Sequence, residues 1–401
     1  MGAPMNNVPP GYKQTEVGVI PEEWEVRSLG ALATMVASGR SSAGRTTGNY
    51  PVHGSTGIIG YTVDPEYEGD AILAARVGAN AGKLNFVSGK YGVTDNTIML
   101  RLGSSHCLPF FWRQLETKRL NRLVFGSGQP LITGTQLKAL PLAIPPLPEQ
   151  RAIATALSDV DALLGTLDRF IAKKRDLKQA AMQQLLTGQT RLPGFHGEWE
   201  VKRMEHAGRC LRGVSYQGDS DLSTHDTAHT KRLLRSNNVQ DAVVVTSEVQ
   251  FVNAERVSPS QVLKENDILI CMANGSKALV GKAGLFAVND GYDYTFGAFM
   301  GCFRTDSTTA NPPFVFSLFH TGRYRDYINN LLAGSSINNL RPSSIESLEF
   351  SFPPLPEQTA IAAVLSDMDA ELVLLEQRLA KTRALKQGMM QELLTGRARL
   401  I

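Results

Sequence analysis

The sequence predicts an α+β protein in which two mixed α/β domains are separated by two long antiparallel helices related by a pseudo-two-fold axis. Three observations predict this fold class. A segment of about 48 residues occurs twice in the chain. Each copy carries the heptad pattern of a coiled-coil-like helix. Each copy also follows a long region of short β-branched and aromatic runs that are punctuated by glycine, which is typical of strands and turns.

The repeat comprises residues 145–192 and 353–400, which align without a gap. About 30 of the 48 positions are identical, far more than chance gives. Each copy begins with the letters PPLPEQ, continues with AIAxxLSDxDA and later reaches LLTG. The alternative, two unrelated core helices of a bundle, does not explain this near-identity. We therefore interpret the copies as equivalent structural elements.

Each copy predicts one long helix. Pro148 and Pro356 fall in a first helical turn, where the missing N–H costs nothing. Gly188 and Gly396 are natural residues for the helix ends. Between them an apolar seam recurs at spacings of four and three, with polar residues near its middle. A helix of about 38 residues is roughly 57 Å long. Two equivalent helices in one chain are best satisfied by packing against each other, as a spacer.

The regions before the helices predict mixed α+β domains. They contain runs such as YPVHGSTGIIGYT and AVVVTSEVQFV, and both begin with related letters, EEWEVRSLGALA and GEWEVKRMEHAGR. We therefore predict a first domain at 1–144, a helical segment at 145–192, a second domain at 193–352 and a second helical segment at 353–401. A shared scaffold with divergent loops suits a pair of recognition modules, and drift after duplication is the alternative.

Composition excludes several classes of protein. The net charge of +3 is too small for DNA binding by charge alone, so any nucleic-acid surface must come from local patches. No run of eighteen apolar residues predicts a membrane span, and the N-terminal letters do not form a signal peptide. The four cysteines are far apart and form no CxxC pair, which favours a reducing cytoplasm over a disulfide framework or zinc ribbon.

With the domain–helix–domain–helix order, the PLPEQ and LLTG letters make the chain resemble the specificity subunit of type I restriction-modification systems. The resemblance covers essentially the whole chain and extends to GYKQTEVGVIPEEWEV and to the YPVHGSTGIIGY and GANAGK loops. It implies two target-recognition domains and two conserved helical regions. Such subunits direct methylation and cleavage by partner subunits to a bipartite, asymmetric DNA site.

The resemblance also implies the partners. We expect double-stranded DNA, two methyltransferase subunits on the two helical copies, and restriction or motor subunits that join through the methyltransferase complex; we expect no membrane partner. In this family the methyltransferase subunits use S-adenosylmethionine to methylate adenine, and the motor-nuclease subunit uses ATP. We therefore expect no catalytic site, cofactor or metal in the chain itself.

One tetrapeptide favours a different class of protein. Asn311-Pro312-Pro313-Phe314 matches the NPP(F/Y) motif with which amino-methyltransferases hold a flipped adenine, and so indicates a self-contained adenine methyltransferase. No FxGxG turn for S-adenosylmethionine occurs in the chain, and the same letters suit a helix start with Asn311 as its N-cap. We favour the structural interpretation. A purely architectural coiled-coil scaffold is a third alternative, against which the divergent loops count.

Other short patterns indicate weaker sites. The loops at residues 78–83 and 275–282 have the wrong spacing for a P-loop, and no Ser or Thr follows the lysine. They are better interpreted as turns whose N–H groups and lysines touch DNA phosphates. His225 and His229 lie four residues apart without a third ligand, so a solvated loop is favoured over a metal site.

The candidate DNA-binding residues are polar or basic residues in loops that the two domains do not share. Arg suits the O6/N7 edge of guanine and Asn or Gln suits the N6/N7 edge of adenine, while Arg and Lys also neutralise phosphates. The candidates of the first domain are Arg40, Ser41, Arg45, Ser55, Arg76, Asn80, Lys83, Asp95, Asn96 and Gln129. Those of the second are Lys231, Arg232, Arg235, Asn237, Asn238, Asn274, Lys277, Lys282, Ser335, Asn338, Asn339 and Arg341.

Overall fold

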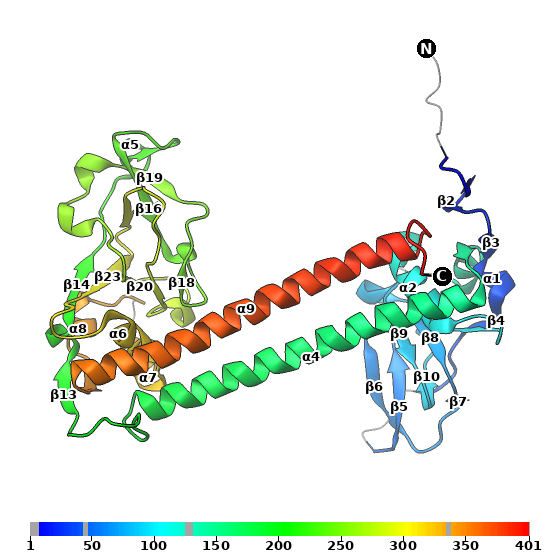
Figure 1. Ribbon diagram of the computed structural model, residues 1–401, viewed down its shortest axis with the longest axis horizontal. Coiled ribbons are helices and arrows are strands. Elements are labelled where there is room, and N and C mark those ends of the chain that lie inside the picture. Colours follow the sequence, from blue (N-terminus) through cyan, green and yellow to red (C-terminus); the bar gives the residue numbers. More distant parts are fainter. Residues whose placement is uncertain (1–7, 43–46, 125–130, 334–337, 401) are drawn as a thin grey trace, which may run out of the picture. The chain divides into compact units, whose positions relative to one another are not determined.

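A computed structural model describes residues 8–42, 47–124, 131–333 and 338–400 (Figure 1). The chain divides into two compact units. Unit 1 comprises residues 1–169 and 377–401, and unit 2 comprises residues 170–376. The two long helices are α4 (Leu147–Leu185) and α9 (Leu355–Leu393), and each begins in one unit and ends in the other. The α+β class and both long helices are confirmed, while the four segment boundaries drawn from the sequence stay a prediction.

Unit 1 contains two four-stranded sheets over its described residues. One has the order β6 (Gly57–Thr62), β5 (Tyr50–Gly54), β10 (Lys90–Val93), β7 (Tyr67–Glu68); the other has the order β4 (Ala33–Ser38), β11 (Thr97–Leu102), β8 (Ala71–Ala75), β9 (Leu84–Val87). Two strand pairs complete it: β1 (Tyr12–Thr15) with β2 (Gly18–Pro21), and β3 (Glu25–Ser28) with β12 (Pro141–Ile144). The shorter helices are α1 (Leu29–Leu32), α2 (Leu108–Thr117) and α3 (Gly134–Lys138).

Unit 2 repeats this framework with a larger sheet. Its six-stranded sheet has the order β14 (Gly208–Arg212), β23 (Met300–Thr305), β20 (Ile268–Cys271), β21 (Ala283–Leu285), β18 (Val243–Val244), β17 (Val239–Gln240). A four-stranded sheet has the order β15 (Leu222–Ser223), β19 (Gln250–Asn253), β16 (Thr230–Leu234), β22 (Tyr294–Phe296), and β13 (Glu200–Arg203) pairs with β24 (Glu349–Phe352). The shorter helices are α5 (Gly218–Asp221), α6 (Pro312–Leu318), α7 (Gly322–Ala333) and α8 (Pro342–Glu346).

The strand pairing shows which elements of the two units are equivalent. The order β4-β11-β8-β9 of unit 1 reappears as β14-β23-β20-β21 in unit 2, and the parallel pair β5–β10 reappears as β16–β22. The antiparallel pair β3–β12, which precedes α4, corresponds to β13–β24, which precedes α9. The duplication that the sequence shows clearly only in the helical segments therefore extends through both units.

The heptad seam predicted on each long helix is confirmed, because every seam residue is buried or half-buried. On α4 the seam is Ile153, Leu157, Val160, Leu164, Leu167, Ile171, Lys174, Lys178, Ala181 and Leu185. On α9 it is Ile361, Leu365, Met368, Leu372, Leu375, Leu379, Thr382, Lys386, Met389 and Leu393. Within unit 1 the start of α4 runs antiparallel to the end of α9, since Lys386 pairs with Asp161 and Arg383 with Asp168.

Equivalent ion pairs join the halves of the two helices that belong to unit 2, with the basic residues now on α4 and the acidic residues on α9. Lys178 of α4 pairs with Asp369 of α9, and Arg175 pairs with Glu376 at 2.5 Å. The three lysines near the middle of the seam, Lys174, Lys178 and Lys386, thus have acidic partners on the opposite helix. Exposed ion pairs of this kind contribute at most about 1 kcal/mol each, so they specify register more than they stabilise.

The PLPEQ letters have a structural role in each unit. Gln150 accepts a hydrogen bond from the backbone N–H of Cys107 at 2.9 Å, next to the start of α2, and donates to the carbonyl of Pro145. In unit 2, Gln358 accepts from the N–H of Asn311 at 2.9 Å and donates to the carbonyl of Pro353. The glutamine therefore fixes a second helix to the entry of each long helix.

The glutamate of the same motif is fully buried and paired with the other copy of the repeat. Glu149 is 0 % exposed and accepts hydrogen bonds from the guanidinium of Arg399 and from the indole N–H of Trp24, the latter at 3.0 Å. In unit 2, Glu357 is 0 % exposed and accepts two hydrogen bonds from Arg191, at 2.6 and 2.7 Å. Bidentate charge-assisted bonds of this kind are among the stronger polar contacts in proteins.

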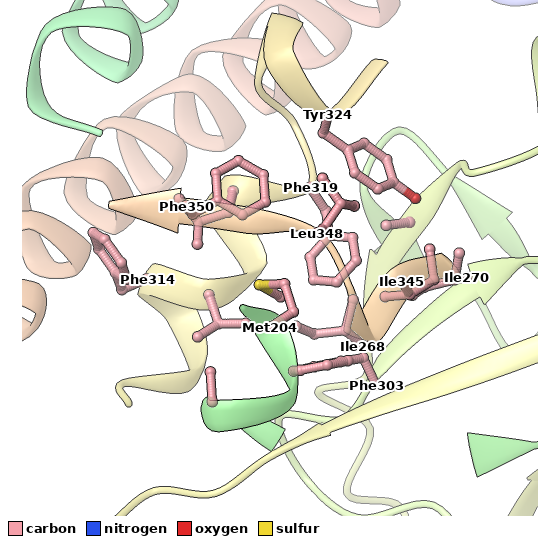
Figure 2. Packing of buried hydrophobic residues seen from close by; sticks show 14 of the residues in the cluster. Met204, Ile268, Ile270, Phe303, Phe314, Phe319, Tyr324, Ile345, Leu348 and Phe350 are labelled. Atoms are coloured by element: carbon pink, nitrogen blue, oxygen red, sulfur yellow. The ribbon is translucent and has the colours of Figure 1, made fainter. Parts of the chain in front are cut away.

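The main core of each unit combines its own domain with parts of both long helices. In unit 2 the apolar cluster joins α4, α9 and the six-stranded sheet, and its centre includes Met204, Ile268, Phe303 and Phe314 (Figure 2). In unit 1 the corresponding cluster includes Trp24, which is 0 % exposed, together with residues from the start of α4 and the end of α9. Neither domain therefore has a complete core without the helices.

A half-buried histidine, His320, is expected to make unit 2 sensitive to acid. Burial lowers the pKa of His320 to about 4, with a further lowering from Lys178 and Arg325 and an opposing effect from Asp369. Its Nε2 atom is buried without a hydrogen-bond partner, and its ring lies 4.6 Å from that of Phe316. Below the ordinary pKa of 6.5 the unfolded chain takes up a proton that the folded unit does not.

We expect the free energy of unfolding of unit 2 to fall as the pH drops from about 6.5 towards 4, by about 2 kcal/mol at pH 5. Denaturant unfolding between pH 7.5 and 5 measures this slope, and His320→Phe should flatten it. An identical slope in the wild-type chain and the variant would show that other groups control the acid response.

Candidate nucleic-acid interface

Unit 2 contains an open cleft of about 1170 Å³ at the end of the parallel strands β16 and β22. Its walls come from the segments that follow β14, β16, β20 and β22, together with Asn338. We call this space cleft 2. It brings together four of the residues predicted from the sequence, namely Arg235, Asn237, Asn274 and Asn338. Far apart in the sequence, these side chains share one concave surface.

Hydrogen bonds within the protein fix the rim of cleft 2. Asn274 accepts from the N–H of Ser276 at 2.9 Å and donates to the hydroxyl of Ser236 at 3.4 Å. Asn338 donates to the carbonyl of Gly275 at 3.2 Å. Because these contacts already order the loops, binding a ligand here requires little further loss of conformational entropy.

The charged group of cleft 2 is Arg235. Its Nε atom is buried without a hydrogen-bond partner among the described residues, which is a costly state for a guanidinium N–H. The neighbouring Asn237 is exposed. A guanidinium and an amide together can donate to guanine O6 or phosphate oxygen and recognise the N6/N7 edge of adenine.

The prediction for Asn238 is wrong. This side chain is 0 % exposed, accepts from the N–H of Arg235 at 2.9 Å, and donates to the carbonyls of Val245 and Ser247 at 3.0 and 2.8 Å. The sequence places it beside Asn237, but the 3-10 turn at Ser236–Asn238 directs it inward. It stabilises the loop that presents Arg235 and Asn237 and does not face solvent.

Unit 1 has a smaller cleft, of about 450 Å³, at the end of the equivalent strands β5 and β10. We call this cleft 1. It brings together the predicted residues Arg40, Ser41, Ser55, Asp95 and Asn96. Arg40, Asp95 and Asn96 are exposed, and Ser55 is half-buried. Cleft 1 thus presents one cation, one anion and one amide, a different set from that of cleft 2.

Ser41 lines cleft 1, but its hydroxyl is already engaged by the protein, and its contact with DNA stays a prediction. It is 7 % exposed, and its hydroxyl accepts from the N–H of Val93 at 2.8 Å and donates to Glu66. The hydroxyl joins two segments of the wall, which leaves the neighbouring Arg40 as the side chain that can reach a ligand.

Two glycines make the common frame of the clefts possible. A Cβ at Gly39 would lie 2.0 Å from the carbonyl oxygen of Val93, and a Cβ at Gly213 would lie 2.0 Å from that of Gly297. Both glycines follow the first strand of their sheet and cross the end of the parallel pair. Only a residue without a side chain permits this close approach, which brings the loop into the wall of each cleft.

Of the two predicted glycine loops, the one in unit 1 lies apart from cleft 1, and the one in unit 2 reaches cleft 2 only at Gly275. In unit 1, Asn80 and Lys83 line a separate hollow with Arg119 and Asn121. Gly82 and Gly281 are equivalent, with φ of +89° and +81° and N–H groups that donate to the carbonyls of Ala75 and Cys271. The loops are therefore tight turns, as expected, and phosphate contact stays a prediction.

Two basic residues of β16 are engaged by acidic neighbours. Arg232 contacts Asp226 at 2.9 Å and Asp290 at 3.3 Å, and its guanidinium lies 3.3 Å from the ring centre of Tyr292. Lys231 pairs with Asp293. Because their charges are already compensated, neither offers the free cation on which their selection depended.

The remaining candidates are scattered. Arg76 is half-buried near the hydroxyl of Ser38, Lys277 is exposed and its Nζ lies 3.4 Å from the carbonyl of Leu332, and Lys282 is half-buried. Asn339 and Arg341 are exposed. Three further candidates lie outside the described residues: Arg45, Gln129 and Ser335.

The NPPF tetrapeptide is a helix start. The Asn311 side chain accepts from the N–H of Phe314 at 3.0 Å and so caps α6, with Pro312 in the first turn. Phe314 is 0 % exposed and belongs to the core (Figure 2). The structural interpretation of these letters is therefore confirmed.

The cleft linings also include residues that sequence reasoning missed. Cleft 2 contains Tyr216 and Phe299, and cleft 1 contains Thr56 and Ile59. Nothing in the sequence shows that an aromatic or aliphatic side chain lines a cleft. Over the described part of the chain, no group of three His, Cys, Asp or Glu residues forms a metal site, and no helix is long and apolar enough to cross a membrane.

Two matches to a family model follow the duplication seen in the structure. The model of the type I restriction modification DNA specificity domain matches residues 21–173 and 230–382, together more than half of the chain. The first match spans the first domain from residue 21, the second begins within the second domain at residue 230, and each continues through the greater part of the long helix that follows.

Similarity to individual proteins covers nearly the whole chain in some cases and less than half of it in others. A protein assigned as the MjaX type I restriction enzyme specificity subunit of Methanocaldococcus jannaschii is 24% identical over 429 residues, 97% of each chain. The EcoKI specificity subunit of Escherichia coli is 30% identical over 174 residues, 43% of this chain and 37% of that protein. The crystal structure of the type I restriction-modification S subunit from M. genitalium has the same fold, with a TM-score of 0.64, 16% identity and coverage of 92% and 96%. The chain therefore belongs to the family of type I restriction-modification DNA specificity subunits.

Proposed function

We propose that this chain recognises a bipartite, asymmetric site in double-stranded DNA, with one half read by each unit. The observation that carries the proposal is the pair of clefts at equivalent positions with different linings. Cleft 1 presents Arg40, Asp95 and Asn96, while cleft 2 presents Arg235, Asn237 and two further amides. Equivalent frames with different donors and acceptors suit two different short sequences, because base edges are distinguished by their donor and acceptor pattern.

We further propose that the chain directs methyltransferase and restriction subunits to this site and has no catalytic site itself. The long helices support a docking role, since they expose apolar residues away from their shared seam. Leu163, Phe170 and Leu177 follow one another at intervals of seven on α4 and are 40–48 % exposed, and Leu374 and Leu385 of α9 are 65 % and 59 % exposed. Two copies of one helical segment suit two copies of one partner, a methyltransferase subunit.

Methylome sequencing tests the proposal. Cells that express the chain with its cognate methyltransferase subunit should methylate a split, asymmetric motif, and cells with that subunit alone should not. Exchanging residues 193–352 for another domain should change one half of the motif only. Methylation that is independent of this chain would support a scaffold instead, and S-adenosylmethionine binding by the isolated chain would support a self-contained methyltransferase.

Individual substitutions in cleft 2 give a graded prediction. We expect Arg235→Ala or Asn237→Ala to weaken specific binding of the assembled complex by about 10- to 100-fold, because one good base contact is worth about 1–3 kcal/mol. The effect should be confined to one half-site. Asn289→Ala serves as the control, since Asn289 is exposed and does not line the cleft. Equal loss in all three variants would place recognition elsewhere.

A further inference from the structure

The wall of cleft 2 carries an aromatic side chain that the fold does not use. Phe299 is 71 % exposed, the largest exposed fraction among the large apolar residues that the structure describes. It lies in the turn between β22 and β23 and lines the cleft with Arg235, Asn237, Asn274 and Asn338. Leaving such a ring in water forgoes the stabilisation that burial gives, so its exposure suggests a partner.

The backbone under this ring is rigid. The carbonyl of Phe299 accepts from the N–H groups of Met272 and Ala273, at 2.9 and 3.1 Å. The N–H of Met300 donates to the carbonyl of Gly297 at 2.8 Å and closes the turn, and the Met300 side chain is 2 % exposed. The ring is therefore held on a fixed support and has only its own two side-chain torsions free.

Unit 1 holds a different residue at the same place. Asn96 lies in the turn between β10 and β11, and its carbonyl accepts from the N–H of Arg76 at 2.9 Å. The N–H of Thr97 donates to the carbonyl of Thr94 at 3.1 Å, which is the turn closure seen in unit 2. Asn96 is exposed and lines cleft 1. One backbone position thus presents an amide in one cleft and a phenyl ring in the other.

We propose that this backbone position determines specificity in each half-site, an inference that rests on the proposed function. In unit 2, Phe299 would contact the 5-methyl group of a thymine in the major groove. An A·T pair shows there an adenine N6/N7 edge and a thymine methyl group. The amides of cleft 2, above all that of Asn237, can bond the adenine N6/N7 edge. The thymine methyl group, the only apolar group of the base pair in the major groove, can contact the ring of Phe299. At the equivalent position, Asn96 has hydrogen-bonding groups and would select a polar base edge.

Replacing thymine by deoxyuridine tests this contact, because it removes the methyl group and leaves the base pairing unchanged. Duplexes carrying the methylated motif are made with each thymine replaced in turn, and binding is measured with the complex of the full chain and its methyltransferase subunit. We expect one replacement in the half-site read by unit 2 to weaken wild-type binding about fourfold or more, from loss of one buried methyl group. The Phe299→Ala complex should bind the thymine duplex and the corresponding deoxyuridine duplex equally. The Phe299→Leu complex should retain part of the preference for the thymine duplex.

Controls separate this inference from the proposed function. Asn96→Ala should keep the deoxyuridine penalty of the wild-type chain, and an unchanged melting temperature of Phe299→Ala would show that it folds. The role of Phe299 is overturned, and the proposed function is not, if the wild-type complex prefers its motif but binds every deoxyuridine duplex as well as the thymine duplex. A half-site of unit 2 without an A·T pair has the same meaning. A complex without any preference for the motif over a scrambled duplex overturns the proposed function.

Discussion

Replacing Arg399 by alanine is expected to lower the free energy of unfolding of unit 1 by about 3–5 kcal/mol. The reason is the state in which Glu149 would be left. Its carboxylate is 0 % exposed and contacts Nε and Nη2 of Arg399, the second at 2.9 Å. Without the guanidinium it keeps the indole N–H of Trp24 as its neutral donor. Removing one partner of a buried ion pair costs much more than the pair itself contributes.

Denaturant unfolding of the full chain measures this effect, with Arg397→Ala as the matched control. Arg397 lies two residues away and is 68 % exposed, with Glu392 at 3.8 Å, so its removal should cost less than about 1 kcal/mol. Adding Glu149→Gln to Arg399→Ala should restore part of the lost stability, because an amide needs no counter-ion. Equal effects of the two arginine substitutions would mean that water reaches Glu149 and compensates its charge.

The second large effect is expected from Gly213→Ala. The added Cβ would lie 2.0 Å from the carbonyl oxygen of Gly297 and 2.7 Å from that of Phe296. Both neighbours are backbone atoms, so the loop or the end of β22 must move. We expect a loss of about 3 kcal/mol or more in the stability of unit 2, at the upper end of the effects of overpacking. Specific binding at the half-site of unit 2 should be lost as well.

Gly322→Ala is the control for this substitution, because nothing lies within 4 Å of a Cβ at that position. Denaturant unfolding gives the stability of each variant, and methylation assays with both half-sites varied give the recognition. Gly39→Ala should have the same consequence for unit 1, where the Cβ would lie 2.0 Å from the oxygen of Val93. A fully stable Gly213→Ala chain with normal recognition would contradict the account of the cleft frame.

The sequence predicted the long helices well because their signals are local. The proline near each start, the heptad seam and the glycine beyond each end all lie within the segment itself. The helices run from Leu147 to Leu185 and from Leu355 to Leu393, and Gly188 and Gly396 have φ of +72° and +73°. The repeat could be recognised from the sequence, but the structural role of its PLPEQ letters could not. The bond from Arg399 to Glu149 joins residues 250 positions apart, which no local pattern reveals.

The candidate site was predicted less well, because residue type alone does not give side-chain direction. Four polar residues of unit 2 do line one cleft, as loop positions of a shared frame should. Asn238 was chosen on the same grounds as Asn237, yet one turn of backbone buries the first and exposes the second. Phe299 was missed because an apolar residue is ordinarily assumed to be buried. Exposure is a property of the packed structure, and the sequence does not state it.

The division of the long helices between the units has a consequence for the order of folding during synthesis. Unit 2 is one continuous stretch, residues 170–376, and can fold as soon as that stretch has left the ribosome. Unit 1 is translated first, yet its core contains Leu393 and Leu394, and its buried Glu149 waits for Arg399. The first unit to be translated is thus the last to be completed. A premature stop just before the codon for Leu393 would consequently damage the unit that is translated first and leave unit 2 intact.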